Sequence, residues 1–257
     1  MYLHYSALSG KGNVRHNNQD NIFCCGNFLL EPESHEVFEL NGCAFRSGVF
    51  AVADGMGGEF AGELASRIAI SSLEKLSEPS DMGQLRNCFF EANDHICKIS
   101  ESEGGVRIGT TLALLSISGR NAFFANIGDS RIYRFREGEL TQISEDHTAV
   151  SSLVAMGLLT PEDAKSHPKR NVLTQHLGIP SSEMVIEPYY QSGTVNLGDI
   201  YLLCSDGLTG FVDDELIRKT LHDYRDVLQL CSDLYAAAED SGSNDNISIV
   251  AVRADII

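Results

Sequence analysis

The sequence predicts an α+β layered fold with mainly antiparallel sheets. Short apolar runs, typical of buried strands, recur along the chain, and amphipathic stretches of helical period separate some of them. Strands crowd into residues 110–143 too densely for repeated βαβ units, which favours antiparallel pairing. No internal repeat or Pro/Ser-rich linker interrupts the 257 residues, so residues 1–257 are expected to form one domain.

The individual elements follow from apolar periodicity. Strands are expected at 49–53, 112–117, 122–127, 200–204 and 247–252. The last is apolar on both faces toward its end, which predicts a position between a second sheet and a helix layer. Helices are expected at 59–76, 80–103, 213–222 and 224–239, with Asp213 as the N-cap of the third.

Two further segments are expected to have their own shapes. Residues 148–178 contain short, helix-like, polar stretches, including Thr160 as a cap before Pro161, and are interpreted as a flap over a site. Residues 26–47 are long for a connection between strands. The Asn41–Gly42 pair predicts a hairpin turn there, with a solvated acidic loop as the alternative.

Composition limits the function classes. Thirty-six acids against nineteen bases give a net charge of −17, which disfavours binding to nucleic acid or to anionic membranes. No apolar run reaches the length of a membrane-spanning helix, and the first residues do not resemble a signal peptide. The seven cysteines include no C-x-x-C pair, and we expect reduced thiols in a cytoplasmic protein.

The informative feature is the position of four aspartates at the ends of expected strands. Asp54 and Asp206 each follow an apolar run and precede a glycine, while Asp20 and Asp245 precede apolar runs. Converging carboxylates repel one another unless a cation lies among them. Oxygen ligands without a His/Cys set indicate Mg²⁺ or Mn²⁺ and not zinc. The alternative for each residue alone is an ordinary turn aspartate.

Six segments resemble, in order, the motifs of the metal-dependent protein Ser/Thr phosphatases of the 2C type. They are GNVRHNNQD (12–20), VFAVADGMGGEFAGELAS (49–66), IGTTLAL (108–114), ANIGDSRIYRFREGELTQISEDH (125–147), LLCSDGL (202–208) and SNDNISIV (243–250). The DGMGG form is similar to the bacterial branch. The resemblance implies a four-layer α/β/β/α sandwich, two antiparallel sheets flanked by helix pairs, with a dinuclear metal centre at one edge.

The resemblance also implies roles for individual residues. Asp54 would bridge two Mn²⁺ or Mg²⁺ ions, the Gly55 carbonyl would bind one, and Asp206 and Asp245 would complete the shell of the other. Asp20 would hold metal-bound water, directly or through a hydrogen bond. Arg15 would clamp the substrate phosphate.

The implied reaction is hydrolysis of phosphoserine and phosphothreonine on proteins by a water that bridges the two ions, reversing the action of a Ser/Thr kinase on the same targets. A monomer is expected. Two alternatives remain. One is a stress-response phosphatase acting on an anti-sigma antagonist, which would usually lack the Arg15 and Asp20 motif. The other is a catalytically inert binding module, which loss of metal-binding acids would mark.

Three positions depart from the family pattern. Gln19 replaces a glutamate that supports the second metal shell, which predicts altered metal affinity. Met56 replaces a histidine proposed in animal relatives as general acid. Residues 104–108, which directly precede the GTT motif, contain no acid, and this argues against a third ion.

Other polar residues near these motifs are expected to be structural. Asp129 and Asp146 are not expected to bind metal, and Arg131 is expected to pair with one of them. His147 is expected to be a satisfied structural histidine, with a proton donor at the site as the alternative.

Overall fold

The computed structural model describes residues 1–29, 37–57, 61–76, 81–224 and 226–256. Its first sheet has the strand order β11-β10-β13-β14-β1-β4, its second the order β12-β9-β8-β5-β2-β3, and every pairing within both is antiparallel. The first sheet comprises β1 (Tyr2–Gly10), β4 (Val37–Phe45), β10 (Arg131–Arg136), β11 (Glu139–Gln142), β13 (Ile200–Cys204) and β14 (Ile247–Asp255). The second comprises β2 (Asn21–Cys24), β3 (Asn27–Phe28), β5 (Ser47–Ala53), β8 (Leu112–Ser118), β9 (Asn121–Ile127) and β12 (Tyr189–Thr194).

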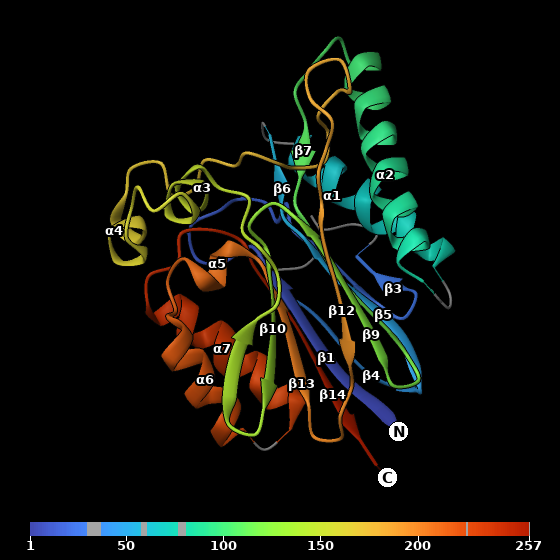
Figure 1. Cartoon of the computed structure of the whole chain (residues 1–257), viewed down its shortest axis with the longest axis vertical. Coiled ribbons are helices and arrows are strands. Elements are labelled where there is room, and N and C mark those ends of the chain that lie inside the picture. Colours follow the sequence, from blue (N-terminus) through green and yellow to red (C-terminus); the bar gives the residue numbers. More distant parts are fainter. Residues whose placement is uncertain (30–36, 58–60, 77–80, 225, 257) are drawn as a thin grey trace.

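Helices cover the outer face of each sheet (Figure 1). On the second sheet lie α1 (Ala61–Ser72), its 3₁₀ extension η2 (Leu73–Lys75) and α2 (Met82–Ser102), and on the first lie α5 (Asp206–Thr209), α6 (Asp214–Asp223) and α7 (Val227–Asp240). The predicted α+β fold with antiparallel sheets and the four-layer α/β/β/α sandwich that the family resemblance implied are both confirmed.

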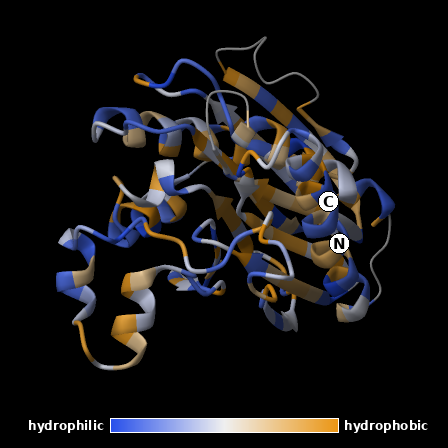
Figure 2. Ribbon diagram, turned by 90° about the horizontal axis from the view of Figure 1, so that it is seen from above, coloured by the Kyte–Doolittle hydropathy of each residue, from blue (hydrophilic) through white to orange (hydrophobic). Residues whose placement is uncertain are grey.

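Three apolar cores lie between the four layers. One lies between the two sheets, and one lies between each sheet and its helices. The central strand β14 contributes to two of them: Val250 and Val252 face the other sheet, whereas Ile247 and Ile249 face the helices. This confirms the position predicted for the strand. Figure 2 shows the same division, with apolar residues concentrated on the inner strands and hydrophilic residues on the outer helix faces.

The predicted helix boundaries agree with the structure to within a few residues. Asp213 accepts a hydrogen bond from the backbone N–H of Leu216 and caps α6, as predicted. The predicted helix 59–76 appears as α1 and η2, and its first two residues lie outside the described residues. The predicted helix 80–103 appears as α2, after its N-cap Asp81. Among the described segments, no helix is both long and apolar enough to cross a membrane.

The hairpin turn predicted at Asn41–Gly42 is wrong. Strand β4 continues through both residues and pairs along its whole length with β1, so that Gly42 lies opposite Tyr5. A Cβ atom at Gly42 would collide with the Tyr5 ring, so the glycine is required for space on the sheet. The preceding part of the predicted hairpin, residues 30–36, lies outside the described residues.

Two short helices, α3 (Ala149–Ala155) and α4 (Pro161–Ser166), lie in the segment 148–178, which we call the flap. They stand beside the sandwich at the end where α5 also lies (Figure 1). Thr148 caps α3 and Thr160 caps α4 directly before Pro161, as predicted for the second helix. The base of the flap is attached through the backbone bond from Thr174 N–H to the carbonyl of His147.

The packing of α7 gives a direct test of the helix-facing core. Leu234 is fully buried, whereas Leu228 on the same helix is 41% exposed. We expect Leu234→Ala to lower the free energy of unfolding by about 2–5 kcal/mol, because it leaves a cavity, and Leu228→Ala to lower it by less than about 0.5 kcal/mol. Urea denaturation measures both. Equal effects would contradict this account of the core.

Candidate active site

Antiparallel pairing brings several strand ends to one end of the sandwich. In the first sheet, the end of β13 and the end of β1 both lie beside the start of β14, since Cys204 pairs with Ile249 and Gly10 with Ile247. In the second sheet, the end of β5 lies beside the start of β2, with Ala53 opposite Asn21. The residues that continue these strands, which include the four candidate aspartates, therefore meet at a shared edge.

Asp20 precedes β2 and is only 1% exposed. Its Oδ2 accepts a 2.8 Å hydrogen bond from the Ser205 hydroxyl. The other carboxylate oxygen, Oδ1, is buried without a hydrogen-bond partner among the described residues. An unpartnered buried carboxylate oxygen is costly, and a cation or its hydration water would remove that cost.

Asp54 follows β5, and two threonines fix its backbone. Its N–H donates to Thr111 Oγ1, and its carbonyl accepts from Thr110 Oγ1 and from the Thr111 N–H, all at 2.9 Å. Gly55 begins the short strand β6 (Gly55–Met56), which pairs with β7 (Gly109–Thr110). A Cβ atom on Gly55 would collide with the carbonyl oxygens of Gly62 and Gln19, so only glycine fits.

Asp206 follows strand β13, and Asp245 precedes the neighbouring strand β14. Asp206 is the first residue of α5, and Asp245 stands two residues before β14. The chain is tightly packed between them, because a Cβ atom on Gly207 would collide with the Asn246 carbonyl. This close packing keeps the two carboxylates on the same edge.

Arg15 lies at the exposed rim of this cluster. Its guanidinium forms a 2.7 Å ion pair with Asp245, and the two side chains are 51% and 29% exposed, respectively. The pKa of Arg15 is raised, mainly by the Asp245 hydrogen bond, with further contributions from Asp54 and Asp206. The guanidinium is therefore attracted by three of the aspartates and remains accessible to a ligand from solvent.

The carboxylates perturb one another strongly. Burial raises the pKa of Asp20 to about 7, with Asp245 and Asp206 adding to the rise and Ser205 and Ser248 opposing it. Burial and then Asp245 raise the pKa of Asp206 to about 6. The pKa of Asp54 is raised well above its ordinary value, first by burial and then by Asp20 and Asp206. Such mutual destabilisation of the charged forms marks a site suited to a cation.

The donor set fits Mn²⁺ or Mg²⁺, although the carboxylates are not arranged as finished ligands. Among the described residues, no three His, Cys, Asp or Glu side chains are gathered tightly enough to hold an ion. Arg15 occupies one oxygen of Asp245, and Asp54 lies within hydrogen-bonding reach of Asp206. The oxygen-only chemistry and the unpartnered Asp20 Oδ1 support the fit.

Sequence reasoning missed the residue that ties the site together. The Asn246 side chain accepts from Gln19 N–H at 2.8 Å and donates to the carbonyls of Lys11 and Asn17 at 3.1 and 2.9 Å. It thereby attaches the loop that carries Arg15 to the start of β14. The only signal in the sequence was its position inside the SNDNISIV motif.

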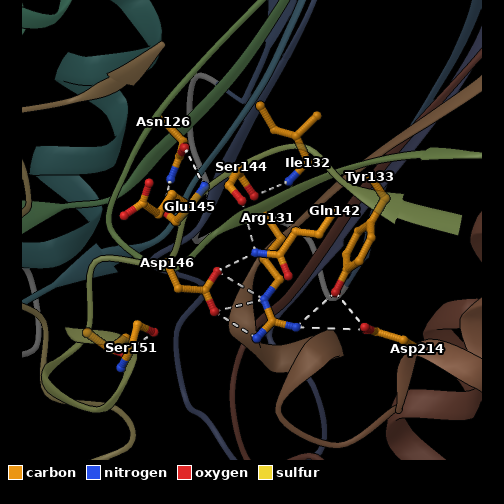
Figure 3. A network of polar contacts seen from close by, with 11 residues as sticks. Asn126, Arg131, Ile132, Tyr133, Gln142, Ser144, Glu145, Asp146, Ser151 and Asp214 are labelled. Carbon is orange, nitrogen blue, oxygen red and sulfur yellow. Dashed lines mark hydrogen bonds and ion pairs between the residues drawn. The ribbon is translucent and has the colours of Figure 1, made fainter. Parts of the chain in front are cut away.

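A second polar network supports the loop after β9 (Figure 3). Arg131 donates to both oxygens of Asp146, at 2.7–3.1 Å, and to the Tyr133 hydroxyl, which in turn donates to Asp214 at the start of α6. The predicted pairing of Arg131 is confirmed, with Asp146 as the partner. Gln142 also donates to Asp146, at 2.8 Å.

His147 has a structural position, as predicted. Its Nδ1 accepts from the Gly128 N–H at 3.1 Å, and its backbone bonds to Gly128 and to Thr174. Burial lowers the pKa of the imidazole, which favours the neutral form that this bond requires. Asp129 is half-buried beside this loop, and burial followed by Asp206 raises its pKa to about 8.

Comparisons with known proteins agree with this fold. Residues 41–249 match the sequence profile of the family described as "Protein phosphatase 2C". The chain is 35% identical over its whole length to the serine/threonine protein phosphatase PstP of Mycobacterium tuberculosis, and it spans 46% of that protein. It is 31% identical to the serine/threonine phosphatase stp of Listeria monocytogenes, with 99% of this chain and 97% of that protein covered.

Solved structures give the same result. The crystal structure of M. tuberculosis PstP superimposes with a TM-score of 0.86 at 34% identity, covering 100% of both chains. A second structure, the PstP catalytic domain in complex with two manganese ions, has a TM-score of 0.82 at 33% identity and covers 99% of both chains. The chain belongs to the protein phosphatase 2C family, on the bacterial side that includes PstP and stp.

The Arg131 network makes a testable contribution to stability. Asp146→Ala would leave the largely buried guanidinium without its main partner, so we expect the free energy of unfolding to fall by about 2–4 kcal/mol. The neighbouring Glu145→Ala removes an exposed carboxylate and keeps the backbone bonds to Asn126, so it should cost less than about 0.5 kcal/mol. Chemical denaturation compares the two variants, and an Asp146 variant as stable as wild type would refute this role.

Proposed function

We propose that this chain hydrolyses phosphoserine and phosphothreonine on proteins in a metal-dependent reaction. The observation that carries the proposal is the meeting of four aspartates at one edge of the sandwich with an accessible arginine at their rim. Membership of the protein phosphatase 2C family supports it, as does the full-length similarity to phosphatases that act on serine and threonine.

Five residues would hold two Mn²⁺ or Mg²⁺ ions. Asp54 would contact both ions, the Gly55 carbonyl one of them, and Asp206 and Asp245 the other, while Asp20 would hold an ion or its water through its unpartnered Oδ1. When bound, such ions lower the pKa of a water and neutralise the charge on a phosphate under attack. The two manganese ions in the PstP catalytic domain support this assignment.

Arg15 would bind the phosphate of the substrate. Its guanidinium can donate two parallel hydrogen bonds to phosphate oxygens, and its half-exposed position allows the phosphate to approach from solvent. In the structure these donors face Asp245, a residue that we assign to metal. A cation bound at Asp245 would therefore take the place of Arg15 there and leave the guanidinium available for the phosphate.

The biological setting follows from the same chemistry. The substrates would be phosphorylated proteins, and a Ser/Thr kinase acting on the same targets would supply them. We propose that the protein acts as a monomer in the cytoplasm, which the seven free cysteines support, and that it binds no nucleic acid, given its charge of −17. The flap would contribute to the surface that meets the substrate.

Metal dependence is the first test. Hydrolysis of a phosphothreonine peptide should stop in EDTA and return with Mn²⁺, more weakly with Mg²⁺. Asp54→Asn should raise the activation free energy by about 4 kcal/mol or more, which lowers kcat roughly a thousandfold, because the bridging charge is lost. The exposed Asp233→Asn on α7 serves as control and should retain wild-type turnover. Full activity in EDTA would exclude the mechanism.

The phosphate role of Arg15 is tested separately. Arg15→Ala should raise KM and lower kcat/KM 30- to 150-fold, a loss of about 2–3 kcal/mol in transition-state stabilisation. The control Lys75→Ala on η2 should have no effect on either constant. Mn²⁺ affinity, measured by calorimetry, should not fall, because the guanidinium competes with cations for Asp245. A loss of Mn²⁺ binding in the Arg15 variant would instead make the residue a structural support of the site.

A further inference from the structure

A closed ring of buried hydrogen bonds surrounds Asp20 and joins the two sheets. It includes Ser9 at the end of β1, Ser248 on β14 and Ser205 after β13, all from the first sheet, together with Asn18 and Asp20 before the second. Every member of the ring is at most 3% exposed. Buried polar groups are costly unless they are hydrogen-bonded, so breaking a bond of the ring is unfavourable and the ring fixes the position of its members.

The bonds can be followed from one group to the next. Asn18 Nδ2 donates to Ser9 Oγ at 2.9 Å, and Ser9 Oγ lies 2.7 Å from Ser248 Oγ. The Ser248 backbone N–H donates to Ser205 Oγ at 3.0 Å. Ser205 donates to Asp20 Oδ2, and the Asp20 N–H returns to Asn18 Oδ1 at 3.2 Å.

The hydrogen-bond directions are fixed on both sides of Asp20. The Asn18 amide orientation is set because its oxygen accepts from the Asp20 N–H, so its nitrogen donates to Ser9. Ser205 Oγ accepts from the Ser248 N–H and donates to Asp20 Oδ2. The ring therefore directs the Ser205 hydroxyl proton at one oxygen of the carboxylate.

We propose that Asn18, Ser9, Ser248 and Ser205 are positioning residues that hold Asp20 with Oδ2 engaged by the Ser205 hydroxyl and Oδ1 presented to the metal site. The ring binds one carboxylate oxygen through Ser205 and leaves the other buried without a partner among the described residues. A carboxylate that is free to rotate would present either oxygen. This inference rests on the proposed function, because it assigns Asp20 to the metal site.

The test uses Mn²⁺ calorimetry on the full chain, with Ser6 as a matched control. Ser6 lies on the same strand as Ser9 and is equally buried, but its hydroxyl has no partner in the described part of the chain. We expect Ser205→Ala to weaken Mn²⁺ binding about tenfold and Ser9→Ala about threefold, the sizes expected on losing a direct and an indirect hydrogen bond to a charged group. Ser6→Ala should bind Mn²⁺ as wild type does.

Two further measurements separate positioning from general stability. Ser205→Thr keeps the hydroxyl and should restore Mn²⁺ affinity to within about twofold of wild type. In an Asp20→Ala background, Ser205→Ala should cause no additional loss, because the carboxylate that Ser205 binds is gone. Activity should follow the same order, with kcat/KM reduced at low Mn²⁺ and recovered at saturating Mn²⁺.

The outcomes are distinguishable. Mn²⁺ binding by the wild type that is unchanged in Ser205→Ala would overturn the inference and leave the proposed function standing. An equal loss from Ser205→Ala with and without Asp20 would also overturn it, since the serine would then act through another group. Absence of Mn²⁺ binding in the wild type would overturn the proposed function together with the inference.

Discussion

The mutual repulsion of buried carboxylates is the constraint on which the rest of the site depends. Asp20, Asp54 and Asp206 all have raised pKa values, because burial and neighbouring acids disfavour their charged forms. A fold that places these groups together must hold their backbones against that repulsion. The threonines under Asp54, the Asn246 bonds to the Arg15 loop and the serine ring around Asp20 do this, each from a rigid strand end.

The two sheets are both necessary for this arrangement. Each sheet alone supplies two of the four aspartates, Asp20 and Asp54 from the second and Asp206 and Asp245 from the first. The inter-sheet core sets their separation, since β14 packs against the second sheet through Val250 and Val252. The geometry of the candidate site and the packing of the core are therefore linked, and a change in the inter-sheet core would alter the spacing of the four aspartates.

The sequence allowed prediction of the parts that depend on local pattern. Strand ends, helix caps and the Asp-Gly pairs are local features, and the convergence of the aspartates followed from them. The serine ring and Asn246 could not be predicted, because their partners lie up to 239 residues away and depend on the register between sheets. The prediction of a turn at Asn41–Gly42 was wrong for a related reason. The glycine leaves room for the Tyr5 ring on the neighbouring strand, and the Asn-Gly pair alone gives no information about that neighbour.

The three hydrogen bonds of the Asn246 side chain restrict which residues can occupy this position. The side chain must accept one hydrogen bond and donate two within a fixed radius. Aspartate has the same shape but no donor, and it would add another negative charge beside Asp245. Glutamine has the same groups but one more methylene, and Asn246 is only 4% exposed. Substitution is therefore restricted by the polarity and the reach of the hydrogen bonds together, with no contact to substrate or metal required of the side chain.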